Sequence, residues 1–451
     1  MNTSAPWKVL HIELSAGIPT LPVEPKYQAI YAVFWWYGIP LGNQEILADQ
    51  LPMPATQLAN LVLQTIVPAV GDRCFAQGFK QSLPAIDPNH AQDMPVNFQA
   101  LIALEKPLKQ LQERCSQPVS GSVSVVVCTC NRPKELARCL RSLQNLSLPP
   151  QEIIVVDNAP NSDATRQLVT QTSGIKYVLE PRPGLSMARN TGICSSVGSI
   201  IAFTDDDVVV HPNWIAQLQQ SFQDPKIMAV TGLMLPAELE TEAQLIFHKG
   251  EGGPNWGYRA VTFDSQFFAD TKSQGVPVWR IGAGANMAFR RKAFDLVGYF
   301  DQRLGAGASG CSEDSELWYR ILAEGWLCRY EPSAVIYHYH RRDMDSLKHQ
   351  SYQYMRGHTA ALLVQFFNYK HWGNIYRLLL DLPIYYKNRL LKELRIGSKS
   401  RHSNVLAEIA GCLAGVKFYI DNRKVAAFPS FPSKSKHNQI TNKVNRTYAK
   451  S

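Results

Sequence analysis

The fold is decided by the stretch Ile200-Ile201-Ala202-Phe203-Thr204-Asp205-Asp206-Asp207-Val208. Its apolar first part predicts a buried β-strand. Three carboxylates follow, and burying them without partners is too costly, so we expect them at the end of the strand, facing water or a cation. Side chains alternate in direction along an extended segment, so Asp205 and Asp207 are expected to share a crevice while Asp206 points elsewhere. The alternative is an acidic turn that starts a helix at Pro212-Asn213-Trp214.

The carboxylates also suggest a ligand. Carboxylate oxygens are preferred by Mg²⁺ and Mn²⁺, and these ions commonly take phosphate oxygens as further ligands. The triplet therefore predicts a divalent cation site at the end of this strand, with a phosphate-bearing ligand beside it.

Length and composition bound the class of protein. A chain of 451 residues predicts two or three domains, and 45% hydrophobic with 18% charged residues fits a folded globular protein. The start, Met1–Trp7, lacks the pattern of a signal peptide, and no uncharged apolar run of about 18 residues predicts a spanning helix. Nine cysteines, with the pair Cys128 and Cys130 at the wrong spacing for zinc, favour reduced thiols in the cytoplasm.

Positive charge is concentrated at the C-terminal end. Residues 370–451 contain sixteen Lys and Arg against four Asp and Glu, a net charge of +12, which leaves −3 for residues 1–369. This asymmetry suits contact of one end of the molecule with an anionic surface. No nucleic-acid-binding signature accompanies it, so nucleic acid is not an expected partner.

Strand and helix patterns alternate in the middle of the chain. This alternation predicts a doubly wound, mostly parallel sheet, and ligands bind such sheets at the carboxyl ends of the strands. Thr129, Asp157 and Asp205–Asp207 fall at those ends. The expected strands are 123–128, 152–156, 175–179 and 200–205, and the expected helices are 133–143, 164–170 and 185–194.

The other parts of the chain have different patterns. Residues 1–118 are expected to form a small, mainly helical accessory domain in which the aromatic run Gln28–Tyr37 is core rather than a docking surface. Residues 119–345 form the sheet domain, residues 346–428 a helical region, and residues 429–451 a disordered basic tail. Basic and apolar residues alternate in the helical region, which suits either helices in a membrane interface or a solvated cap over the sheet.

Several motifs occur in a fixed order. The first half carries Val125–Arg132, Val155–Asn158, Gly184–Gly192 and Asp205–Asp207, and the second half carries Gly282–Arg291, Gly298–Asp301, Ser312–Arg320 and Val335–His338. Together they resemble the family 2 glycosyltransferases with a GT-A fold over roughly residues 123–340. The chain departs from the family pattern at Ala159-Pro160-Asn161-Ser162, at Ser312 and in lacking the Gln-x-x-Arg-Trp signature of processive synthases.

The resemblance implies a GT-A-like mixed sheet and a defined reaction. The implied activity is metal-dependent, inverting transfer of a sugar from a nucleoside-diphosphate sugar, with a UDP-sugar expected, to a hydroxyl of a glycan or lipid-linked acceptor. The missing processive signature favours single addition. The expected location is the cytoplasm, with peripheral contact to an anionic membrane on its inner face.

The resemblance also assigns the donor site. Asp207 is the expected direct ligand of Mn²⁺ or Mg²⁺, with Asp205 and His338 as further ligands. Asp205 could instead meet the ribose or a metal-bound water, and Asp206 could exchange roles with either aspartate. The expected nucleotide-sugar contacts are Thr129, Arg132, Asp157, Arg189, Asp205 and Asp206. Alternatives are a turn cap for Asp157, salt bridges for both arginines and a structural role for His338.

Asp314 is the expected general base. Glu313 beside it counts as a second catalytic candidate, because neighbouring carboxylates repel and one of them can have a raised pKa. The alternative for Asp314 is the N-cap of a helix over residues 316–323.

Two other functions compete with glycosyl transfer. A sugar-1-phosphate nucleotidyltransferase would need a glycine-rich loop with a basic residue after the first strand, and Thr129–Pro133 contains no glycine. A non-catalytic binding module for nucleotide-sugars or glycans would not need both the aspartate triplet and the Glu313-Asp314 pair.

Overall fold

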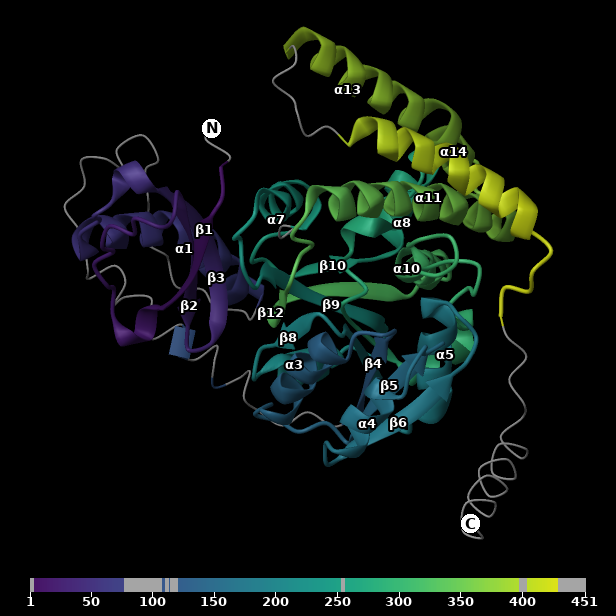
Figure 1. Ribbon diagram of the computed structural model, residues 1–451, viewed down its shortest axis with the longest axis horizontal. Helices are drawn as coiled ribbons and strands as arrows, with labels where there is room; N and C mark the ends of the chain where they lie inside the picture. The colour runs from purple at the N-terminus through teal and green to yellow at the C-terminus, as the bar shows by residue number, and fades with distance from the viewer. Residues whose placement is uncertain are drawn as a thin grey trace.

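A computed structural model gives the structure of the chain and describes residues 4–76, 108–109, 113, 121–252, 256–396 and 404–428. A small N-terminal unit, a central sheet with helices on both faces and a group of C-terminal helices make up the described part (Figure 1). The predicted tail at residues 429–451 lies outside the described residues.

The central sheet has nine strands in the order β10-β12-β9-β11-β7-β4-β5-β6, with β8 paired to β12. Strands β4 to β7 run parallel, whereas β11 lies antiparallel to β7 and β9. This is the doubly wound mixed sheet that the sequence predicted. The strands are β4 (Val123–Thr129), β5 (Glu152–Asn158), β6 (Ile175–Glu180), β7 (Ile200–Asp205), β8 (Val208–Val210), β9 (Ile227–Pro236), β10 (Val261–Phe263), β11 (Asn286–Arg290) and β12 (Leu327–His338).

Both faces of the sheet are buried. Side chains of β4 and β7 alternate between two cores: Val126 and Phe203 contribute to one, and Val125 and Ala202 to the other. Burial on both faces explains why these strands read as continuous apolar runs in the sequence. The helices of this domain are α3 (Pro133–Gln144), α4 (Ala164–Thr170), α5 (Leu185–Ser195), α6 (Trp214–Ser221), α7 (Glu242–Phe247), α8 (Ser265–Thr271), α9 (Arg291–Val297) and α10 (Glu313–Ala323).

The N-terminal unit is not mainly helical over its described residues, so that prediction is wrong. It holds a three-stranded sheet, β1 (Trp7–Glu13), β2 (Ala29–Trp36) and β3 (Ile39–Leu47), packed with α1 (Ala55–Ala76). The run at β2 is rich in β-branched and aromatic residues, which favour strands, and every residue of β2 is buried. The aromatic run is therefore core, as predicted.

The C-terminal region is helical, as predicted. Helix α11 (Met344–Tyr369) lies between the sheet domain and the outer helices α13 (Leu382–Ile396) and α14 (Val405–Asn422) (Figure 1). The short α12 (Gly373–Tyr376) and the π-helical turn η6 (Arg377–Asp381) lead from α11 into α13. Among the helices that the structure describes, none has the length and apolar character needed to cross a bilayer.

Candidate active site

A cavity of about 1620 Å³ opens at the carboxyl ends of the parallel strands. The ends of β4, β5 and β7 form one wall, and the loop before β11 together with the N-terminus of α10 forms another. The C-terminal helices α11 and α13 close a third side. The cavity therefore lies where a doubly wound sheet places its ligands.

All three aspartates of the triplet line this cavity. Strand β7 ends at Asp205, so Asp206 and Asp207 lie in a turn and the alternation expected of a strand does not extend to them. Asp206 accepts hydrogen bonds from Thr129 Oγ1 (2.7 Å) and Arg132 Nη1 (2.6 Å). Arg132 Nη2 also reaches Asp207 Oδ2 at 3.0 Å. The prediction that Asp205 and Asp207 share a crevice while Asp206 points elsewhere is corrected: all three line the cavity, and Asp206 and Asp207 share Arg132.

The turn places its carboxylates in different electrostatic environments. Burial raises the pKa of Asp206 to about 7, although Arg132 opposes the rise. Burial also acts to raise the pKa of Asp207, but His338 and Arg132 outweigh it and hold that pKa below its usual range. His338 Nε2 lies 3.2 Å from Asp207 Oδ1, and this carboxylate raises the pKa of His338 against the effect of burial. Asp207 is thus the carboxylate held most firmly in its charged form.

Arg189 connects the aspartate triplet at the end of β7 with the acidic N-terminus of α10. Its side chain is only 2% exposed, forms an ion pair with Glu313 and lies 3.5 Å from Asp205 Oδ1. Burial raises the pKa of Glu313, and Arg189 opposes that rise. Glu313 is buried and occupied by its ion pair with Arg189. The neighbouring Asp314 is half-buried in the cavity wall, so its carboxylate is the more accessible of the two.

Asp314 does not cap α10 in the way that the sequence suggested. The helix begins at Glu313, three residues earlier than expected, and Ser312 is its N-cap residue with φ of 72°. Asp314 therefore lies in the first turn, where Oδ1 accepts hydrogen bonds from Ser315 N (2.6 Å) and Ser315 Oγ (3.2 Å).

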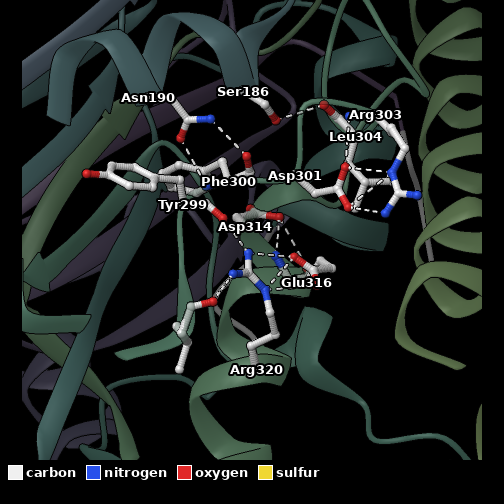
Figure 2. A network of polar contacts seen from close by, with 12 residues as sticks. Ser186, Asn190, Tyr299, Phe300, Asp301, Arg303, Leu304, Asp314, Glu316 and Arg320 are labelled. Carbon is white, nitrogen blue, oxygen red and sulfur yellow. Dashed lines mark hydrogen bonds and ion pairs between the residues drawn. The ribbon is translucent and has the colours of Figure 1, made fainter. Parts of the chain in front are cut away.

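A network of polar contacts fixes α5 and α10 relative to each other (Figure 2). Asn190 of α5 donates to Phe300 O (2.8 Å) and accepts from Phe300 N (2.9 Å), and Ser186 donates to Leu304 O. Arg320 of α10 pairs with Glu316 (2.8 Å) and donates to Tyr299 O (2.7 Å). The loop before α10 is therefore tied to α5, which carries Arg189, and to α10, which carries Asp314.

Comparisons with known proteins identify this arrangement. The family model described as glycosyl transferase family 2 matches residues 124–298. The succinoglycan biosynthesis protein ExoM of Rhizobium meliloti is 31% identical over 228 residues, which cover 48% of this chain and 66% of that protein. The sheet domain of this chain belongs to glycosyltransferase family 2.

Another relative matches over a shorter share of its own length. A pre-mycofactocin glycosyltransferase of Mycobacterium tuberculosis is 28% identical over 233 residues, 51% of this chain and 45% of the relative. Among solved structures, the mannosyltransferase PcManGT from Pyrobaculum calidifontis, in complex with GDP-Man and Mn²⁺, is 13% identical with a TM-score of 0.44. That match covers 80% of this chain and 99% of the other. The chain thus spans about half to two thirds of the length of these curated relatives.

Asp157 of the glycosyltransferase domain is placed differently from its neighbours. It is fully buried, accepts a hydrogen bond from Tyr177 Oη (2.9 Å) and is not among the cavity-lining residues. The next residue, Asn158, lines the cavity and accepts a hydrogen bond from Gly184 N (3.0 Å) at the start of α5. The nucleotide contact of Asp157 stays a prediction, and Asn158 is the residue of β5 that reaches the cavity.

The sequence predicted a helical cap over the sheet as one alternative, but it identified none of the cap residues as part of the site. His358, Arg377, Tyr385 and Arg389 of the C-terminal helices line the cavity, together with Trp279 from the segment before β11. The Arg377 guanidinium lies 4.0 Å from the centre of the Trp279 ring, and its Nη1 pairs with Asp381 at 2.8 Å. The spacing of Arg377 and Asp381 is the sequence signal that could have indicated an ordered helical wall here.

Proposed function

We propose that this glycosyltransferase moves one sugar residue from a nucleoside-diphosphate sugar, expected to be a UDP-sugar, to a hydroxyl group of an acceptor, with inversion. The observation that carries the proposal is that Asp205–Asp207 and Asp314 line the same cavity. The carboxylates of Asp205–Asp207 are suited to the donor, and the carboxylate of Asp314 is suited to the acceptor. Arg189 lies between them, within reach of Asp205.

The proposed divalent ion fits the residues at the triplet. Asp207 Oδ1 is buried and accepts no hydrogen bond from the residues that the structure describes, with His338 Nε2 3.2 Å away. Carboxylate and imidazole suit Mn²⁺, and carboxylate suits Mg²⁺. As the side chains stand, no group of three or more such ligands among the described residues is placed to hold an ion. We therefore propose Asp207 and His338 as protein ligands, with Asp205 or water completing the set. When bound, the ion would neutralise charge on the diphosphate.

The chain's own cations have a related task. Arg132 is 30% exposed at its side chain and is paired with two aspartates, so it can exchange one of them for a phosphate oxygen at little cost in desolvation. Arg189 is fixed by Glu313 and keeps a positive charge beside Asp205. Thr129 orients Asp206. We propose that these residues hold the donor and stabilise the leaving nucleoside diphosphate.

Asp314 is proposed to remove the acceptor proton. As the acceptor oxygen bonds to the anomeric carbon, its proton passes to an Asp314 oxygen, and the bond from that carbon to the nucleoside diphosphate breaks on the opposite face. Attack from the opposite face inverts the configuration at that carbon. Glu313 is better suited to holding Arg189 than to this step, because its carboxylate is buried in an ion pair.

The acceptor is proposed to be a glycan or a lipid-linked sugar. A relative from Haloferax volcanii, 26% identical over 191 residues, is named a glucosyl-dolichyl phosphate glucuronosyltransferase. Its name supports a lipid-linked acceptor for this chain. We further propose that the protein acts in the cytoplasm, with peripheral contact to an anionic membrane.

Release of nucleoside diphosphate tests the proposal. The purified chain is incubated with a panel of nucleotide-sugars and candidate acceptors in Mn²⁺, in Mg²⁺ and in excess chelator. We expect release with one donor, dependence on the metal, and a raised melting temperature with that donor, because a ligand that binds the folded state stabilises it. A nucleotidyltransferase would instead consume a nucleoside triphosphate, and a binding module would show the melting shift without release.

A further inference from the structure

Large aliphatic side chains face outward on α14. Leu406 is 74% exposed, Leu413 70% and Ile420 53%, and the three are spaced seven residues apart on one face of the helix. A helix that faces water normally shows its polar side there. This face is therefore unusual for a surface in contact with water alone.

The opposite face of α14 is buried and contains two glycines beside Val405, Glu408 and Tyr419. A Cβ on Gly411 would lie 2.3 Å from Tyr352 O, and one on Gly415 would lie 2.1 Å from Thr359 Oγ1, so both glycines pack directly against α11. This close packing fixes which side of α14 faces outward, so Leu406, Leu413 and Ile420 stay outside the core. An exposed group of large apolar side chains of this kind suits an apolar partner.

The neighbouring helix also exposes large aliphatic side chains. Leu379 (63% exposed), Leu380 (51%) and Ile384 (54%) of η6 and α13 point outward, whereas Leu382 and Tyr386 of α13 are buried against the other C-terminal helices. Arg389 of α13 pairs with Glu408 of α14 at 2.5 Å, which holds the two helices together. Both lie on the outside of the molecule, beyond α11 (Figure 1). We call the exposed residues Leu379, Leu380, Ile384, Leu406, Leu413 and Ile420 the outer apolar face.

Charge decides which partner this face suits. Exposed Lys387 and Lys392 of α13, and Lys417 and Lys424 at the C-terminal end of α14, lie among or beside the apolar residues. The acidic residue Asp421 pairs with Lys417, yet residues 370–451 still carry +12. A second copy would bring the same positive charge against this face, whereas an anionic lipid surface has the complementary charge. Lysine stems can also lie along acyl chains while their ammonium groups stay at the headgroups.

We propose that the outer apolar face docks on an anionic lipid bilayer, with its aliphatic side chains inserted below the headgroups and the lysines at headgroup level. In this docking, α13 and α14 would lie in the plane of the interface. Helix α13 also lines the active-site cavity through Tyr385 and Arg389, which places that cavity beside the bilayer. The docking deepens the membrane contact given under the proposed function, because it names the face that makes it. The placement of the cavity favours a lipid-linked sugar as the acceptor, an assignment that rests on the proposed function.

Vesicle sedimentation of the full chain, without nucleotide-sugar, tests the docking. The probes are vesicles of phosphatidylcholine alone and of phosphatidylcholine with phosphatidylglycerol. We expect binding to the anionic vesicles and weaker binding as salt rises. The double variant Leu413→Ser/Ile420→Ser should bind those vesicles at least about tenfold more weakly than the parent. It removes two apolar side chains that would insert into the bilayer, and it leaves the charge unchanged. The matched control Val23→Ser/Val197→Ser alters residues of 55% and 67% exposure outside this face and should bind as the parent does.

The other outcomes count against the proposal. No binding to anionic vesicles at low salt, or equal binding by Leu413→Ser/Ile420→Ser and the parent, would overturn insertion by this face. A dimer in light scattering that the double variant abolishes, with no vesicle binding, would assign the face to a second copy. Melting temperatures show that each variant is folded, and a Leu406→Ser variant repeats the test at another position. Donor release is measured separately, so a wrong donor leaves the vesicle result intact.

Discussion

Replacing Asp314 by asparagine separates catalysis from folding. The amide oxygen of Asn can accept the same hydrogen bonds from Ser315 N and Ser315 Oγ that Asp314 Oδ1 accepts. What is lost in stability is mainly the attraction of a carboxylate to the helix N-terminus, about 0.3–1 kcal/mol. What is lost in catalysis is the proton acceptor, which contributes roughly 10²–10⁴-fold. In barrier height this is about 3–5 kcal/mol, so the catalytic effect exceeds the structural one several-fold.

Glu313→Gln is the matched comparison. It neutralises the partner of a buried arginine and leaves Arg189 with Asp205 at 3.5 Å. Breaking a buried pair in this way costs about 3–5 kcal/mol at most, so the melting temperature should fall by several degrees. Asp314→Asn should instead lower the melting temperature far less and keep its affinity for the donor. Glu313→Gln is therefore expected to change mainly the melting temperature, whereas Asp314→Asn is expected to change mainly turnover.

The assay measures turnover at saturating donor and acceptor, the dissociation constant of the donor and the melting temperature, for both variants and the parent. Asp314→Asn is expected to lose mainly turnover. If it is stable and fully active, the base is assigned wrongly and Glu313 becomes the residue to test. If its melting temperature falls as far as that of Glu313→Gln, Asp314 has a structural role that the contacts described above do not explain.

Three further predictions concern the metal, the acid stability and the packing of α14. Asp207→Ala should weaken activation by Mn²⁺ at least about tenfold in a metal titration of donor release, and undiminished activation would remove Asp207 from the proposed ligands. Burial acts to raise the pKa of Glu180, but hydrogen bonds from Arg182 and Thr191 outweigh it and lower that pKa. Glu180→Gln should therefore be less stable than the parent by about 1–2 kcal/mol above pH 4.5, the unfolded value, and the difference in urea unfolding should vanish as pH falls through the lower folded pKa. Gly415→Ala should loosen α14 by about 1–3 kcal/mol, seen as faster proteolysis of the C-terminal helices, whereas Gly250→Ala, where a Cβ meets nothing within 4 Å, should not.

The sequence by itself determined the parallel half of the sheet, β4 to β7. Strands β4, β5 and β7 are buried on both faces, so each is a short apolar run that can be recognised without its neighbours, and β7 begins and ends where Ile200 and Asp205 predict. The position of the cavity was also predictable from the sequence. Parallel strands bring their carboxyl ends to one edge of the sheet, and this does not depend on the conformation of the loops. Thr129 and the aspartate triplet were located by this reasoning alone.

Other features depended on contacts between distant segments. The N-terminal sheet pairs β1 with β2 in parallel, and the single aromatic run at β2 gives no periodicity that identifies its partners. Asp157 and Asn158 are adjacent in the chain, yet only Asn158 reaches the cavity, because Tyr177 of the neighbouring strand takes the carboxylate of Asp157.

The structure alone decided how the charges are paired. Arg132 lies 74 residues from Asp206, and Arg189 lies 124 residues from Glu313. A charged residue has many candidate partners along a chain, and burial selects among them by the cost of leaving any charge unpaired. The same holds for the C-terminal helices: their sequence shows basic and apolar residues, but only packing against α11 determines which side lines the cavity and which aliphatic side chains remain outside.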